Sequence, residues 1–125
     1  TPNIPVYSGI LVLPLVGEVD TNRATRIMET LLEEIVRDQA EVVLIDITGV
    51  PMVDTTVANY LLQIGKAVEL LGAQVVLVGI SPEIAQTMVQ LDINMSTIVT
   101  RSNLQAGIEY ALKLQGQAIQ PIEEE

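Results

Sequence analysis

The chain has 125 residues, the length of a single domain, and its 16 acidic and 6 basic side chains give a net charge of −10. It contains no cysteine and no histidine, which excludes disulfides, thiolate and imidazole metal ligands, and catalysis by a cysteine nucleophile or a histidine base. The basic residues are scattered along the sequence and no apolar run approaches the roughly 20 residues of a membrane span, so we expect no nucleic-acid surface and no membrane segment.

The first part of the chain predicts two strands, a helix and a third strand. Residues 6–16 form two apolar strands that pair across a tight turn. Apolar residues at helical spacing predict a helix over residues 21–38, capped by Asp20 or Thr21. Residues 42–47 are almost all apolar, which is typical of a strand that is covered on both faces of a parallel sheet.

The middle of the chain repeats this alternation. A second amphipathic helix lies between a capping Asp54 and a terminating Gly72. Residues 74–79 form the next buried strand. The Ser81-Pro82 pair then begins a short helix, because serine is a good N-cap and proline suits the first helical position.

The last part predicts one more strand and one more helix. Residues 97–99 form a short strand, and Ser102 to Gln105 match a capping box, so the final helix follows Ser102 and reaches about residue 117. Alternating strands and helices with Val- and Ile-rich strands define an α/β domain with a largely parallel sheet. We assign residues 1–118 to this domain and residues 119–125 to an acidic tail.

Sites in open α/β sheets gather at the carboxyl ends of the strands, where the loop from residue 48 to residue 56 is the densest in polar residues. One interpretation is a receiver-like phosphotransfer site with Mg²⁺ at Asp46. Nucleotide binding is a second, but no glycine-rich phosphate motif is present, and Gly17 and Gly49 are interpreted as turn glycines with positive φ. A third is a regulated hydroxyl at Thr55, and the structural alternative is that Thr55 and Thr56 only start a helix.

The segment from Asp46 to Thr55 (DITGVPMVDT) resembles the signature of STAS domains, the family of sulfate transporters and anti-sigma factor antagonists. Within that family, residues 13–20 (LPLVGEVD), residues 79–87 (GISPEIAQT) and the opening Ile4-Pro5-Val6 resemble the RsbR-type proteins of the stressosome. The resemblance extends over about residues 4–115. One departure is Asp92, where the family pattern leads us to expect glycine.

The resemblance implies the STAS fold, a mixed and mostly parallel sheet of four to five strands with four to five helices mainly on one face. It implies a non-catalytic scaffold of the bacterial stressosome. We expect no cofactor and no metal, and because no targeting signal is visible in the sequence we expect a cytoplasmic location. The expected partners are an RsbS-type STAS protein and an RsbT-type serine/threonine kinase, together with a homodimer and a larger assembly. The chain would be the C-terminal part of a longer protein.

The resemblance also assigns site residues. Thr55 and Thr87 match the two phosphorylated threonines of RsbR-type proteins, although Thr87 has a second interpretation as a helix-packing residue at the border of the core. The expected partner-binding residues are Pro51, Met52, Asp54, Thr55 and Thr56. The alternatives are a simple anti-sigma factor antagonist, which has one switch hydroxyl and lacks a counterpart of Thr87, and the receiver-like domain that uses Asp46.

Overall fold

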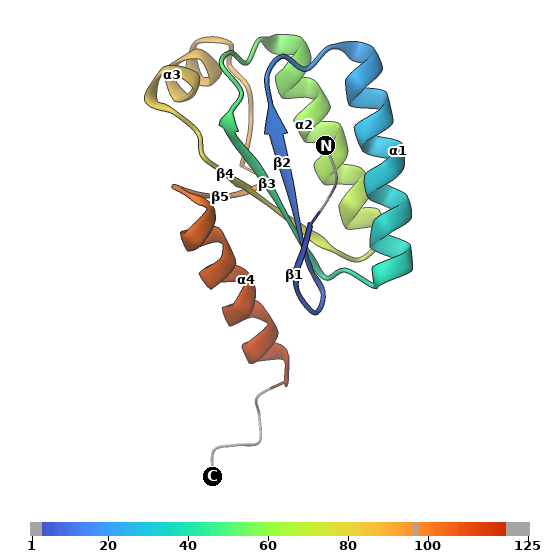
Figure 1. Ribbon diagram of the computed structural model, residues 1–125. Coiled ribbons are helices and arrows are strands. Elements are labelled where there is room, and N and C mark those ends of the chain that lie inside the picture. The colour runs from blue at the N-terminus through green and yellow to red at the C-terminus, as the bar shows by residue number, and fades with distance from the viewer. Residues whose placement is uncertain (1–3, 97, 120–125) are drawn as a thin grey trace.

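The computed structural model describes residues 4–96 and 98–119, which form a five-stranded sheet and four helices (Figure 1). In chain order these elements are β1 (Ile4–Tyr7), β2 (Ile10–Val16), α1 (Thr21–Asp38), β3 (Val42–Gly49), α2 (Thr55–Leu70), β4 (Gln74–Val78), α3 (Pro82–Gln90), β5 (Val99–Arg101) and α4 (Leu104–Ile119).

The strands lie in the sheet in the order in which they occur in the chain, from β1 to β5. The hairpin partner β1 is antiparallel to β2, and the pairs β2–β3, β3–β4 and β4–β5 are parallel. Each parallel connection therefore moves the chain one strand in the same direction. Since such crossovers are almost always right-handed, α1, α2 and α3 must all lie on one face of the sheet.

Two apolar layers follow from this topology because side chains alternate between the two faces of each strand. In β3, Val43, Ile45 and Ile47 face the layer covered by α1, α2 and α3. Val42 and Leu44 face the opposite layer, which α4 covers with its buried Ala111. Burial on both faces explains why the central strands have almost no polar residues.

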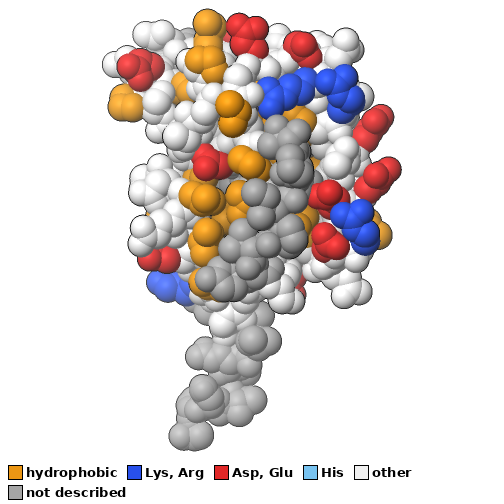
Figure 2. All heavy atoms as spheres, viewed as in Figure 1, with side chains coloured by type: hydrophobic (Ala, Val, Ile, Leu, Met, Phe, Trp, Pro, Cys, Tyr) orange, Lys and Arg blue, Asp and Glu red, His pale blue; other side chains and the backbone are white. Residues whose placement is uncertain are grey.

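The strand residues beneath α4 are buried, whereas several apolar side chains of α4 itself are less so. Leu104 and Ile108 of α4 are only partly buried, and Leu112 is exposed. Figure 2 shows hydrophobic side chains gathered in the middle of this face, with most charged side chains toward its margins. In the part of the chain that is described, no helix is both long and apolar enough to cross a bilayer.

Most of the predicted element starts are confirmed. Asp20 caps α1 by accepting the amide of Arg23 at 2.8 Å, and Ser81 caps α3 by accepting the amide of Ile84 at 3.1 Å. Gly72 follows the end of α2 with φ +88, as expected for a terminating glycine.

Two predicted boundaries near the end of the chain are wrong. The last strand runs over Val99–Arg101 instead of residues 97–99, and Thr97 lies outside the described residues. Helix α4 is capped by Asn103, whose Oδ1 accepts the amide of Ala106 at 2.9 Å, so Ser102 does not form the predicted capping box. The start of α4 shifts because Ser102 and Asn103 follow one another and both are acceptable caps.

Candidate functional site

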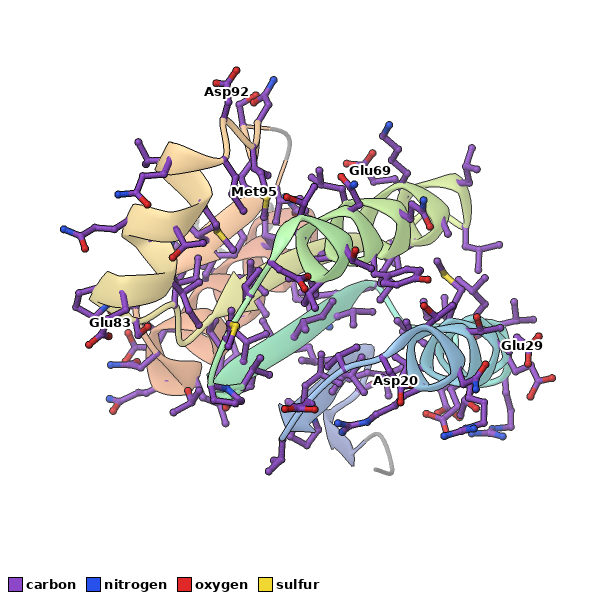
Figure 3. All side chains as sticks on the ribbon, turned by 90° about the horizontal axis from the view of Figure 1, so that it is seen from above. Asp20, Glu29, Glu69, Glu83, Asp92 and Met95 are labelled. Carbon is purple, nitrogen blue, oxygen red and sulfur yellow. The ribbon has the colours of Figure 1, made fainter. Side chains whose placement is uncertain are left out.

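The carboxyl ends of the parallel strands form one edge of the sheet, and Figure 3 looks down on this edge. Here the loops after β2, β3 and β4 lie close together. The amide of Gly17 donates to the carbonyl of Gly49 at 2.9 Å, which joins the first loop to the end of β3. Gly79, with φ +85, passes so close to Asp46 and Thr48 that a side chain at this position would collide with them. The three loops therefore form one continuous surface.

The two loop glycines singled out in the sequence differ in their backbone conformation. Gly17 has φ +80, as predicted for a turn glycine, whereas Gly49 does not have a positive φ and belongs to β3. A Cβ at Gly49 would lie 3.1 Å from a methyl of Val16 and 3.2 Å from the carbonyl oxygen of Leu15. Close approach of β2, and not a left-handed turn, is therefore the reason for glycine at this position.

The start of α2 carries the candidate switch residue. Asp54 is the N-cap, and its Oδ1 accepts the amide of Val57 at 2.9 Å. Thr55 and Thr56 are the first two residues of the helix, and both are exposed. Val53 is 1% exposed and fills the core beneath them. The helix start is thus anchored from below while its hydroxyls face outward.

The loop before Asp54 contains one buried and two exposed apolar residues. Val53 is buried and plugs the top of the core, whereas Met52 is 70% exposed and Pro51 is exposed as well. An exposed methionine next to an exposed proline forms a small apolar projection within three residues of Thr55. Large exposed apolar side chains of this kind are suited to contact with another protein.

Thr55 also lines a groove of about 400 Å³ that the sequence did not predict. One wall is a stripe of α2 in which Thr55, Asn59, Leu62 and Lys66 recur at the spacing of one helix face. The other wall is the segment from Leu91 to Asn94, which follows α3. The groove combines apolar side chains with amides, a carboxylate and an ammonium, and Thr55 lies at the end that adjoins the loop.

Thr87 lies on α3 and does not line this groove. It is partly buried, between the buried Ile84 and Met88, which agrees with the border position inferred from the sequence. Its hydroxyl donates to the backbone carbonyl of Glu83 at 3.0 Å. A reaction at this hydroxyl would have to break that bond, so Thr87 is less accessible than Thr55.

Asp46 is the residue that the receiver-like alternative would use, and its carboxylate forms hydrogen bonds with a residue of the same strand. The pairing of β2 with β3 shifts between Pro14 and Val16, which leaves an extra residue in β3. Asp46 Oδ1 accepts both the amide of Thr48 at 2.9 Å and its hydroxyl at 2.6 Å, so the carboxylate stabilises this bulge. In residues 4–96 and 98–119, no group of three acidic residues is arranged to hold a metal ion.

Residues 1–107 match the family model of the STAS domain, and the chain belongs to the STAS domain family. It is 55% identical over 113 residues to the RsbT co-antagonist protein RsbRA of Bacillus subtilis (strain 168), an alignment that covers 90% of this chain and 41% of that protein. It is 42% identical over 110 residues to RsbRB of the same organism, covering 88% of this chain and 40% of that protein. The chain thus spans about two fifths of the length of these curated relatives.

Solved structures of stressosome proteins have a fold similar to that of this chain. A variant of Moorella thermoacetica RsbS superposes with a TM-score of 0.78 and 29% identity, over 91% of this chain and 96% of that chain. A chain from a structure of the stressosome, described as a signal integration and transduction hub, superposes with a TM-score of 0.76 and 27% identity, over 91% of this chain and 98% of that chain. The predicted STAS fold and the resemblance to RsbR-type proteins are therefore confirmed.

Proposed function

We propose that this chain is the STAS domain of an RsbR-type stressosome scaffold and that phosphorylation on threonine changes how it binds its partners. The observation that carries the proposal is the position of Thr55, exposed on the first turn of α2 between the Asp54 cap and the groove. Identity with RsbT co-antagonist proteins supports the role in the stressosome. The domain acts as a regulator without catalysis of its own, and its role is cytoplasmic.

A phosphate on Thr55 would change the electrostatic charge of this surface. It would add about −1.5 to −2 charges at neutral pH. The first amides of α2 and the helix dipole attract this charge, whereas the carboxylate of Asp54 repels it. Because Val53 and Val57 remain buried beneath the helix start, the phosphate would alter the loop and the groove without opening the core.

The proposed partners are an RsbS-type STAS protein and an RsbT-type serine/threonine kinase, with self-association into a dimer and a larger assembly. Pro51 and Met52 supply the apolar part of the partner-binding surface, and Asp54, Thr55 and Thr56 supply its polar part. A charge added in the middle of this surface would weaken or strengthen the contact according to the charge of the partner. A coupling of about 1–3 kcal/mol is sufficient for a switch of this kind.

Thr87 is the second proposed phosphorylation site, and we expect it to react after Thr55. Its hydroxyl is bonded to Glu83 and its side chain is partly buried, so we expect a kinase to reach it less readily than the exposed Thr55. The test is phosphopeptide mass spectrometry over time after incubation with Mg-ATP and the host's RsbT-type kinase. We expect phosphate on the Thr55 peptide first and on the Thr87 peptide later.

Two variants make the experiment decisive. Thr55→Ala should remove the early phosphorylation while leaving the circular dichroism spectrum unchanged, since the side chain is exposed. Thr56→Ala, one residue along the same helix turn, is the matched control and should leave the early phosphorylation intact. Phosphate that persists on the same peptide in Thr55→Ala, or a chain that neither binds nor is modified by the kinase, would overturn the proposal.

A further inference from the structure

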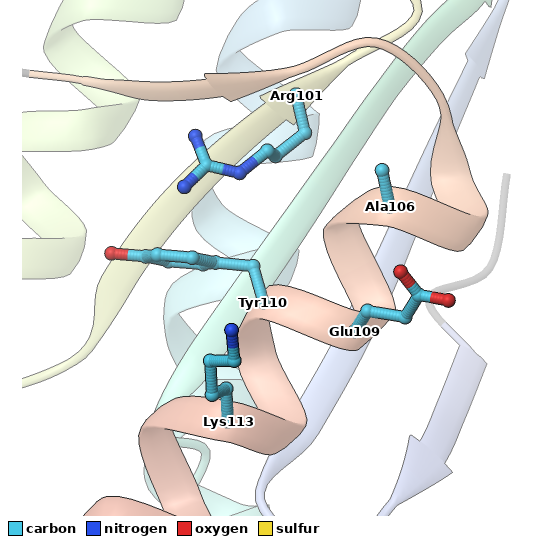
Figure 4. Close-up of a pocket in the computed structure, with 5 residues that line it drawn as sticks. All are labelled: Arg101, Ala106, Glu109, Tyr110 and Lys113. Atoms are coloured by element: carbon cyan, nitrogen blue, oxygen red, sulfur yellow. The ribbon is translucent and has the colours of Figure 1, made fainter.

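A second pocket lies between β5 and α4, on the opposite side of the sheet from the groove beside Thr55. It encloses about 430 Å³ and is lined by Arg101, Ala106, Glu109, Tyr110 and Lys113, which we call the basic pocket (Figure 4). The proposed switch at Thr55 does not use any of these residues. The basic pocket is therefore a separate candidate for binding.

The basic pocket brings to one aromatic ring two of the six basic side chains, which are scattered along the sequence. The guanidinium carbon of Arg101 lies 4.4 Å from the centroid of the Tyr110 ring. Figure 4 shows the ammonium of Lys113 on the other side of that ring. Two positive charges thus converge on one pocket in a chain whose net charge is −10.

No acidic side chain neutralises these two cations in the part of the chain that is described. Glu109 precedes Lys113 by four residues on α4, a spacing that commonly allows an ion pair. Its carboxylate instead points away from the Tyr110 ring in Figure 4 and accepts a hydrogen bond from the side-chain amide of Gln105 at 3.5 Å. Among residues 4–96 and 98–119, neither Arg101 nor Lys113 forms an ion pair. Two uncompensated cations that line the same pocket favour the binding of an anion there.

The pocket is held in place before any ligand binds. Arg101 donates from Nη1 to the carbonyl of Thr100 at 2.7 Å, which leaves its Nε and Nη2 for other acceptors. The hydroxyl of Tyr110 accepts a hydrogen bond from the side-chain amide of Gln74 at 3.4 Å, which links the ring to β4. These contacts fix the guanidinium and the ring, and binding requires little further ordering.

We propose that the basic pocket binds the phosphate group of a small phosphate monoester. A phosphate monoester carries about two negative charges at neutral pH and so matches the two positive charges of Arg101 and Lys113, whereas a single carboxylate matches only one. The planar guanidinium of Arg101 presents paired donors to phosphate oxygens, and the ammonium of Lys113 contributes a point charge from the other side. The remainder of the ligand would lie on Ala106 and the edge of Tyr110.

The test is an NMR titration of the 125-residue chain with inorganic phosphate at constant ionic strength maintained with sodium chloride. We expect saturable shifts of the amides of Arg101, Ala106, Tyr110 and Lys113. Arg101→Gln and Lys113→Gln should each weaken phosphate binding by at least about tenfold, because each removes a charge-assisted hydrogen bond. The apparent affinity should not change in Thr55→Ala, which separates this site from the proposed switch.

Arg26→Gln is the matched control, since Arg26 is exposed on α1 and the substitution removes the same charge far from the pocket. It should leave the affinity for phosphate unchanged. Circular dichroism verifies that each variant folds. The proposal is overturned if no saturable shift appears, or if both pocket variants bind phosphate as the unmodified chain does. Equal affinity for succinate, a dicarboxylate, would overturn the assignment to phosphate.

Discussion

Asp54 stabilises the helix on which the proposed switch residue lies. Its Oδ1 accepts the amide of Val57, and its backbone carbonyl accepts the amide of Ala58, so the first turn of α2 is fixed at both bonds. This cap, together with the buried Val53, holds Thr55 in a defined position. The same carboxylate lies next to any charge added at Thr55. Asp54 therefore has a structural role and an electrostatic role, which two substitutions can separate.

Asp54→Ala should lower the free energy of unfolding by about 0.5–2 kcal/mol, because the amide of Val57 loses its acceptor. Asp54→Asn keeps an acceptor oxygen at the same position and should lose only a small part of that stability. Urea unfolding followed by circular dichroism measures both values. Equal losses for the two variants would mean that the carboxylate charge, and not the capping bond, stabilises α2.

Asp92 is the residue at which the sequence departs from the family pattern, and its backbone explains why glycine was expected. It has φ +57, and the amides of Asp92 and Ile93 donate to the carbonyls of Val89 and Met88, which closes the end of α3. Gly72 occupies the equivalent position after α2 with φ +88. Two helices thus end in the same motif, one with glycine and one with aspartate.

Asp92→Gly should raise the free energy of unfolding by up to about 1 kcal/mol, since glycine adopts a positive φ without steric cost. Gly72→Asp is the reciprocal variant and should lower it by a similar amount, because open space surrounds Gly72 and only the backbone conformation resists the change. Thermal unfolding of both variants is the measurement. A stabilising Gly72→Asp would contradict this account of the motif.

Helix starts that follow a good capping residue could be predicted from the sequence, to within Asp20 or Thr21 in the case of α1. The starts of α1, α2 and α3 follow from Asp20, Asp54 and Ser81, each of which accepts an amide three residues later. The start of α4 could not be predicted in this way. Ser102 and Asn103 are both good caps, and only tertiary packing of α4 on the sheet decides between them.

The choice between these two caps gives a prediction for α4. Asn103→Ala should lower the free energy of unfolding by about 1 kcal/mol, because the amide of Ala106 loses its acceptor. Ser102→Ala should change it by less than about 0.5 kcal/mol, as for other exposed positions without such a bond. Urea unfolding distinguishes the two variants. A larger loss for Ser102→Ala would restore the capping box that the sequence suggested.

At the scale of the whole molecule, local features of the chain could be predicted better than contacts between residues that are far apart in the sequence. Asp54 could be predicted as a cap because its bond to Val57 is local, and Thr55 follows it directly in the chain. The groove beside Thr55 could not, since its other wall begins at Leu91, on a different element. Likewise, Arg101 and Lys113 lie on a strand and a helix, and only the packing of α4 against β5 brings them to one ring.

The close packing of α4 on the second face of the sheet depends on Gly107. A Cβ at Gly107 would lie 2.7 Å from a methyl of Val78 and 3.3 Å from a methyl of Leu44. The absence of a side chain therefore lets α4 approach the central strands closely. Gly116, on the same helix, has no atom within 4 Å of such a Cβ. Substitutions at these two glycines can therefore distinguish the effect of packing from that of helix propensity.

Gly116→Ala should raise the free energy of unfolding by about 0.5–1 kcal/mol, because alanine is the better helix former and meets open space. Gly107→Ala gains the same propensity but must displace α4 or strain Val78, and overpacking of this kind costs about 1–3 kcal/mol. We therefore expect Gly107→Ala to be destabilising in urea unfolding. Displacement of α4 would also separate Tyr110 from Arg101, so this variant should weaken phosphate binding while Gly116→Ala leaves it intact. Equal stability of the two variants would show that α4 does not depend on close contact with the sheet.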